Sequence, residues 1–166
     1  MDTPTNDNSR AGNPYFGLRR QVFDMAGEME GMSDMHPINA AVVDMDMGSA
    51  VVSLVCVADG TVSLYFSNGG GQLGLGQADE NIRKAAIAFL SSADQVLGIT
   101  DIMDAMEDFP LPRDGKHFVH LISPNCVYRK ELDMKSINEE PRESQFLNFL
   151  YQNVLAKIGE HNQHGK

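Results

Sequence analysis

The chain contains no tryptophan and only two cysteines, Cys56 and Cys126, among 166 residues. Small secreted modules that are held together by disulfides carry cysteine at a much higher density, so that class of protein is not expected. Each cysteine lies in an apolar, strand-like pattern, which favours two buried reduced thiols over a disulfide between neighbouring strands. The chain is long enough to bury one hydrophobic core without a metal or a disulfide.

Positive charge is also scarce, because 13 lysines and arginines stand against 23 acidic residues, giving a formal net charge of −10. Affinity for nucleic acid depends on cationic contacts, so neither nucleic acid nor an anionic membrane is expected as a partner. The longest nearly apolar run, 50–58, is far shorter than the about 20 residues of a membrane-spanning helix. Residues 1–10 lack the apolar segment of a signal peptide, so we expect a cytoplasmic protein.

Apolar periodicity predicts one α+β domain over residues 14–158, with a disordered N-terminal tail, 1–13, and a C-terminal tail, 159–166. Asp59-Gly60 predicts a two-residue hairpin with a type I′ turn, in which both central residues have positive φ. Consecutive hairpins imply an antiparallel sheet of about five strands with helices on its faces, in the order α-β-β-β-α-(α)-β-β-α. The predicted helices cover 14–29, 77 or 79 to 97, 100–107 (short and acidic) and 143–158, and the strands 38–47, 50–58, 61–67, 116–122 and 126–132.

This element order is similar to that of the roadblock/profilin-like group, which has a central antiparallel sheet clad in helices. In addition, 61–71 reads T-x-S-L-Y-F-S-x-G-G-G and is followed by a helix with Ala85-Ala86 and Phe89-Leu90. This middle third of the chain resembles an uncharacterised bacterial family. The resemblance implies a bacterial protein and carries no activity, because a shared topology does not assign a function.

Five glycines within eight residues join a predicted strand to a predicted helix, an arrangement that can present backbone N–H groups to a ligand. Their spacing matches neither the phosphate-binding loop nor the dinucleotide fingerprint, and Asp79 and Glu80 oppose an anion. A close strand-to-helix crossing is the favoured interpretation, and a bound small ligand or peptide is the alternative. With three flanking side chains, the candidate ligand-binding residues are Gly69, Gly70, Gly71, Gly74, Gly76, Tyr65, Arg83 and Lys84.

His117 and His120 lie three residues apart on a predicted strand, so they point to opposite faces and cannot share a metal ion. One is expected in solvent and the other in the core or an interface. Asp44 and Asp46 share a strand face and could bind a divalent cation with His36. A solvated strand edge that discourages wrong pairing is favoured instead.

A cysteine nucleophile would need Cys126 beside His117 or His120, but its neighbours Val127 and Tyr128 indicate packing. The four acidic residues between 101 and 108 are interpreted as the charged surface of a short helix. We therefore assign no catalytic residue, no metal and no cofactor.

Six of the ten methionines lie between 25 and 47, a pattern typical of core packing or of an adaptable binding surface. The expected function is a non-catalytic protein-interaction or scaffolding module that forms a homodimer. The alternative is a small-molecule or nucleotide-binding protein or enzyme that uses the glycine loop, 69–76. A third hypothesis is an acidic immunity or inhibitor protein that pairs with a basic partner.

Overall fold

One antiparallel sheet of seven strands organises the molecule. The computed structural model describes residues 14–28, 38–103, 109–124 and 126–164. The strands are β1 (Ala40–Asp46), β2 (Val51–Val57), β3 (Val62–Phe66), β4 (Gly71–Gln72), β5 (Asp101–Met103), β6 (Lys116–Ile122) and β7 (Val127–Asp133). Their spatial order is β4-β3-β2-β1-β6-β7-β5. The α+β class with an antiparallel sheet is confirmed, but the prediction of about five strands is wrong.

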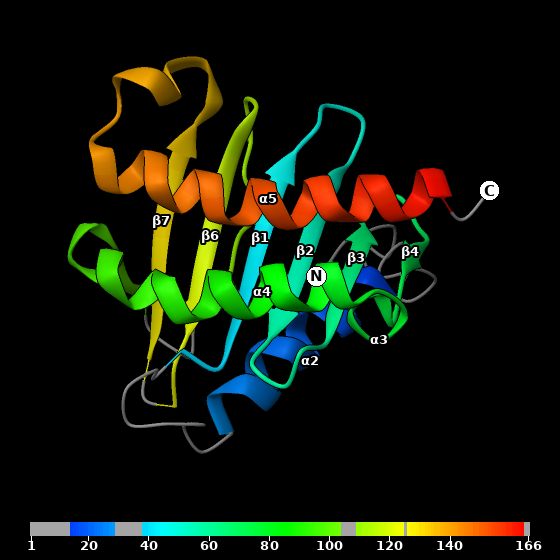
Figure 1. Cartoon of the computed structure of the whole chain (residues 1–166). Coiled ribbons are helices and arrows are strands. Elements are labelled where there is room, and N and C mark those ends of the chain that lie inside the picture. The colour runs from blue at the N-terminus through cyan, green and yellow to red at the C-terminus, as the bar shows by residue number, and fades with distance from the viewer. Residues whose placement is uncertain (1–13, 29–37, 104–108, 125, 165–166) are drawn as a thin grey trace, which may run out of the picture.

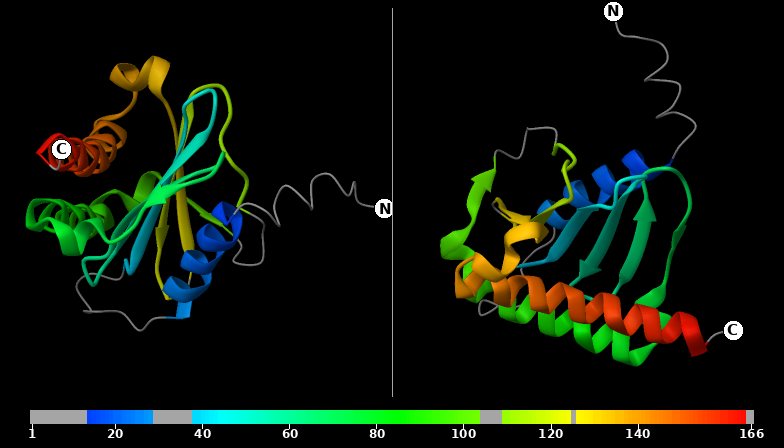
Figure 2. Two further views of the ribbon diagram at one scale, coloured as in Figure 1. Left: turned by 90° about the vertical axis from the view of Figure 1, so that its right-hand side faces the viewer. Right: turned by 90° about the horizontal axis from the view of Figure 1, so that it is seen from above.

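Helices cover both faces of this sheet. They are α2 (Tyr15–Glu28), α3 (Leu75–Ala78), α4 (Glu80–Ala93) and α5 (Arg142–His164), with 3-10 helices η1 (Asp94–Ile99) and η2 (Met134–Glu139). Figure 1 shows α4 and α5 side by side across one face, and Figure 2 shows α2 against the opposite face. In the described part of the chain, the sheet therefore has a layer of two helices, α4 and α5, on one side and the helix α2 on the other.

The two strands that the sequence analysis missed are the short edges of the sheet. β4 pairs Gly71 and Gln72 with β3, and β5 pairs its three residues with Val127–Arg129 of β7. The predicted acidic helix over 100–107 is therefore wrong at 101–103, and 104–108 lie outside the described residues. The acidic pattern suggested a helix surface, but pairing with β7 satisfies the backbone of these residues as an edge strand instead.

Strand β1 lies at the centre of the sheet, between β2 and β6. Ala41, Val43 and Met45 pack in the core beneath α4 and α5, whereas Ala40 and Val42 pack in the core beneath α2. The two faces alternate with the two-residue repeat of a strand. Because helices cover both faces, even Asp44, a charged residue of β1, lies inside the molecule.

The hairpin between β2 and β3 is present, but its turn differs from the prediction. Gly60 has φ +96°, whereas Asp59 does not have a positive φ, so the type I′ assignment is wrong. Gly60 N donates to Val57 O at 2.9 Å, and Val57 N donates to Thr61 O at 2.9 Å. These bonds enclose a three-residue loop, in which a glycine in the left-handed region is the usual last residue.

The ends of α4 and α5 also differ from the prediction. Residues 94–99 form the 3-10 helix η1 instead of continuing α4, and α5 extends to His164, six residues past its predicted end. Phe149, a large apolar residue of α5, is 63% exposed. His161 near the end of α5 lies 3.1 Å from the carboxylate of Asp79, which caps the start of α4, so the two helices are tied at that end.

Candidate functional site

A buried ion pair joins α2 to the centre of the sheet. Asp44 on β1 is fully buried, and Arg19 on α2 is 7% exposed. Arg19 donates from Nε to Oδ1 and Oδ2 at 3.1 and 3.2 Å and from Nη2 to Oδ2 at 2.6 Å. The predicted solvated edge is therefore wrong for Asp44, because β1 is central and α2 covers it. A buried carboxylate needs such a partner to offset the loss of hydration.

Two hydroxyl groups complete the hydrogen bonding of this carboxylate. Ser53, directly opposite Asp44 on β2, donates from Oγ to Oδ1 at 2.5 Å. Tyr15 lies with its hydroxyl 2.6 Å from Ser53 Oγ, and it donates because the Ser53 proton points to Asp44. Burial, with the nearby Asp44 charge, raises the pKa of Tyr15 to about 12. Tyr15 therefore stays protonated and is the first donor in this series of hydrogen bonds, from Tyr15 to Ser53 to Asp44.

His120 on β6 lies beside this ion pair. Its Nδ1 donates to Val42 O at 3.1 Å and lies 3.6 Å from Asp44 Oδ2. Burial among the rings of Phe23 and Phe109 lowers the pKa of His120 to about 4, although the Asp44 charge acts in the opposite direction. The neutral ring leaves Nε2 without a hydrogen-bond partner among the described residues. We call Tyr15, Arg19, Asp44, Ser53 and His120 the Asp44 cluster.

The other predicted polar residues do not join this cluster. His117 points to the opposite face, where Nδ1 lies 2.7 Å from the hydroxyl of Tyr151 on α5. The opposite orientation of the two histidines is confirmed, but the expectation that one faces solvent is wrong, since both are buried. Asp46 accepts from the backbone N–H groups of Gly115 at 2.9 Å and Gly48 at 3.0 Å, which lower its pKa.

Metal and nucleophile chemistry gain no geometric support in the described part of the chain. Those residues contain no group of three His, Cys, Asp or Glu side chains arranged to bind a metal, and His36 lies outside them. Cys56 and Cys126 are both free thiols. Burial raises the pKa of the Cys56 thiol, and Cys126 Sγ lies 3.6 Å from Ser123 Oγ.

The glycine loop has backbone reasons for its composition. Gly69, Gly70 and Gly74 have φ of +111°, +85° and +68°. A Cβ atom on Gly71 would lie 2.5 Å from Leu64 O. A Cβ atom on Gly76 would lie 1.9 Å from Gly60 O, because α3 crosses the β2–β3 loop closely. These contacts support the favoured interpretation of a close strand-to-helix crossing.

The side chains predicted to flank the loop lie on different faces of the sheet. Tyr65 is buried in the core beneath α2, whereas Arg83 and Lys84 belong to α4 on the other side. Arg83 donates from Nη1 to Gly76 O at 3.3 Å, and Lys84 pairs with Glu80 at 3.3 Å. The structure therefore does not bring the eight predicted residues together into one site.

An opening lies on the α2 side of the sheet, between α2 and the segment 109–113. Its volume is about 840 Å³. Arg19 lines this opening and also belongs to the Asp44 cluster, so the buried ion pair forms part of the wall of the opening. We call this opening the arginine hollow. Its lining residues are Phe16, Arg19, Arg20, Val51, Phe109, Pro110, Leu111, Pro112 and Arg113.

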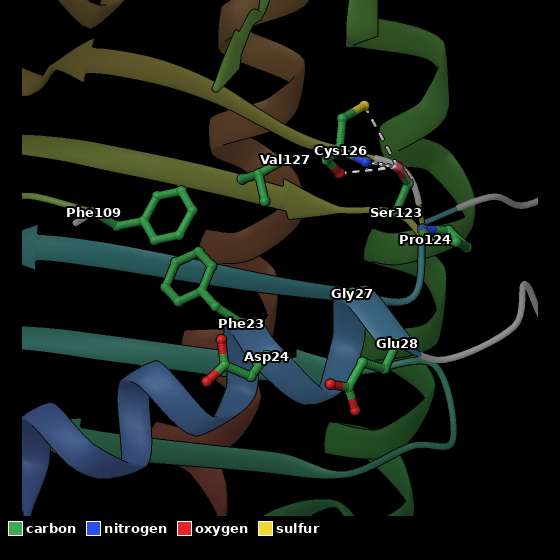
Figure 3. A pocket seen from close by; sticks show the side chains of 9 residues that line it. All are labelled: Phe23, Asp24, Gly27, Glu28, Phe109, Ser123, Pro124, Cys126 and Val127. Carbon is green, nitrogen blue, oxygen red and sulfur yellow. Dashed lines mark hydrogen bonds between the residues drawn. The ribbon is translucent and has the colours of Figure 1, made fainter. Parts of the chain in front are cut away.

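A second cavity, of about 220 Å³, lies further along α2 and shares Phe109 with the arginine hollow. Figure 3 shows the rings of Phe23 and Phe109 at one end of it, with Asp24 and Glu28 along α2. The two rings are stacked with centroids 4.1 Å apart. The charge along α2 therefore changes from basic at the hollow to acidic at this second cavity.

Arg19 is not among the site residues predicted from the sequence. A signal was present, because Arg19 falls on the stripe that α2 buries with Tyr15, Val22 and Ala26. A charged residue within an apolar helical stripe requires a buried counter-charge. Asp44, on a strand whose neighbours are apolar, was the matching residue. Only the packing of α2 on β1 shows that the two meet.

Comparison of the chain with protein-family models, curated proteins and solved structures gave no significant match. The resemblances to the roadblock/profilin-like group and to a bacterial family therefore stay predictions. None of the described helices is long and apolar enough to cross a lipid bilayer.

Proposed function

We propose that this protein is a non-catalytic interaction module that binds a peptide segment of a partner protein in the arginine hollow. The observation that carries the proposal is the hollow itself. Its volume of about 840 Å³ falls within the about 300–1,000 Å³ of ligand-binding pockets. Phe16, Val51 and Leu111 give it the apolar walls that anchor side chains of a partner use.

The wall on the 109–113 side supports peptide binding because it is stiff. It reads Phe109-Pro110-Leu111-Pro112, and each proline has a restricted φ. Phe109 is further held by its stacking on Phe23 of α2. A surface that is ordered before binding loses less conformational entropy when a partner docks.

The buried polar groups of the Asp44 cluster support the proposal because they hold α2, and with it one wall of the hollow, in place. Asp44 accepts from Arg19 and from Ser53, and Ser53 accepts from Tyr15. These groups are engaged with one another and hold α2 on the sheet. They therefore shape one wall of the hollow.

A displayed library of random dodecapeptides tests the proposal. Immobilised wild-type protein is expected to enrich a peptide set, and Leu111→Asp is expected to lose it, because Leu111 lines the hollow. Leu73→Asp is the matched control, since Leu73 is 68% exposed and lies outside the hollow. Both variants are first checked for native thermal unfolding. Enrichment that Leu111→Asp leaves unchanged, or no enrichment, overturns the proposal.

We also propose self-association as a homodimer through the layer of α4 and α5. Support comes from Phe149 on α5, 63% exposed, and Ile87 on the adjacent α4, 41% exposed. Light scattering after size exclusion is expected to give twice the monomer mass, and Phe149→Glu is expected to give the monomer. A wild-type monomer across micromolar concentrations overturns this part and leaves peptide binding untouched.

A further inference from the structure

The arginine hollow is lined by positive charge, whereas the chain as a whole is negatively charged. Among the residues that the structure describes, three of the chain's 13 lysines and arginines line it and no aspartate or glutamate does, although acidic residues number 23 in the whole sequence. A cleft lined by one sign of charge focuses its field on the ligand that enters. Because the walls are also apolar, the chemistry of the hollow suits a ligand that is both apolar and anionic.

Arg19 is held in a fixed orientation at the inner wall. Asp44 engages its Nε and Nη2 atoms, and its guanidinium carbon lies 5.2 Å from the centroid of the Phe23 ring. The remaining donor atom, Nη1, has no acceptor among the described residues. A guanidinium that the protein already orients loses little freedom when it binds a carboxylate.

The two outer arginines differ in how they are held. Arg20 pairs with Asp24 at 3.2 Å, with both side chains about half exposed, and its guanidinium carbon lies 6.0 Å from the centroid of Phe109. An exposed pair of this kind contributes little to stability, so Asp24 is a weak competitor for a ligand carboxylate. Arg113 is exposed and makes no ion pair with any residue that the structure describes.

We infer that the arginine hollow recognises a peptide segment in which an aspartate or glutamate lies next to a large apolar residue. The carboxylate is bound by Arg113 and Arg20 at the rim with Arg19 behind them, and the apolar side chain lies against Phe16 and Leu111. This inference rests on the proposed function and names its partner class. A single carboxylate fits better than a chain of phosphates, because Asp44 already neutralises Arg19 and the whole protein carries −10.

The experiment uses the peptides enriched by the full-length protein. Each is synthesised with its acidic residues and with the corresponding Asn or Gln, and both forms carry an amidated C-terminus. Fluorescence anisotropy then measures the dissociation constant of each form. We expect the acidic form to bind wild-type protein up to about fivefold more tightly, as for partly exposed charge pairs. That advantage is expected to shrink with added salt.

A double-mutant cycle assigns the effect to the hollow. Arg113→Gln is expected to weaken the acidic peptide and to leave the amide peptide unchanged. Arg142→Gln is the matched control, because Arg142 is exposed at the start of α5 on the far face of the sheet. It is expected to change neither affinity.

Three outcomes overturn the inference. If acidic and amide peptides bind the hollow equally well, the inference is overturned and the proposed function stays in place. Enriched peptides that lose binding when their C-terminus is amidated, or that bind only when phosphorylated, assign the anion to another source and overturn the inference. A library that yields no hollow-dependent peptide overturns the proposed function as well, so the two failures are distinguishable.

Discussion

Arg19 and Asp44 meet at 2.6 Å between Nη2 and Oδ2, beneath α2 and at the central strand of the sheet. Neither side chain is exposed by more than a tenth. The pair therefore links α2, the only long helix described on its face of the sheet, to β1, the central strand. The same arginine lines the hollow, so the link also sets the shape of the proposed binding surface.

Removing the buried carboxylate charge is expected to destabilise the protein strongly. Asp44→Asn leaves Arg19 charged, buried and uncompensated, which costs about 3–5 kcal/mol. Urea unfolding followed by circular dichroism measures this. Glu131→Gln, which breaks the exposed pair between Glu131 and Lys116, is the control and is expected to change stability by less than about 1 kcal/mol. Equal losses in the two variants would contradict a buried, charged Arg19–Asp44 pair.

Replacing both members of the pair tests the reason for that loss. The double variant Arg19→Met with Asp44→Leu removes both charges and is expected to recover most of the stability lost in Asp44→Asn. The same variant is expected to weaken binding of acidic peptides selected on the hollow, because Arg19 no longer lines it. A double variant less stable than Asp44→Asn would show that the pair is stabilising beyond its mutual neutralisation.

His120 is expected to make the protein less stable in mild acid. Its pKa falls from 6.5 in the unfolded chain to about 4 in the folded protein, mainly through burial. Between these values the unfolded chain binds a proton that the folded protein does not, so the free energy of unfolding decreases as pH falls from 6.5 to 4. The decrease from this group is about 3 kcal/mol. Urea titrations at several pH values should show it in wild-type protein and not in His120→Phe.

The carboxylates provide an internal check on that pH dependence. Asp46 and Asp79 both have lowered pKa values, through backbone N–H donors above all, so their contributions are lost only as pH falls through the carboxyl range. Their losses appear in wild-type protein and in His120→Phe alike. The difference between the two curves therefore reports His120 alone.

Gly76 is expected to tolerate no larger residue. The Cβ of Gly76→Ala would lie 1.9 Å from Gly60 O, and backbone on both sides must shift, which costs about 1–3 kcal/mol or more. Gly17 on the exposed side of α2 is the control, because nothing lies within 4 Å of its Cβ position. Gly17→Ala is expected to stabilise the protein by about 0.5–1 kcal/mol. Thermal unfolding distinguishes the two, and similar midpoints would contradict the close crossing.

The glycine loop as a ligand site stays a prediction with a direct test. If the backbone contacts of Gly71 and Gly76 explain the glycines, nucleotides and acyl compounds should not raise the unfolding temperature. A ligand that raises it in wild-type protein, and fails to do so in Lys84→Gln, would instead establish the alternative function.

The parts of the fold that follow from short-range periodicity were predictable. The alternation of Ala41, Val43 and Met45 against Val42 and Asp44 depends only on the two-residue repeat of a strand. The edge strands β4 and β5 were not predictable, because two or three residues carry no period and are ordered by the strand beside them. The same limit hid the candidate site, since Arg19 and Asp44 are 25 residues apart and belong to different elements.

The brevity of β4 and β5 has a consequence for how this protein behaves in concentrated solution. A strand from another molecule that docked on β4 or on β5 would find backbone partners along only two or three residues. Fibrous growth by adding strands to these two elements of the native fold is therefore disfavoured.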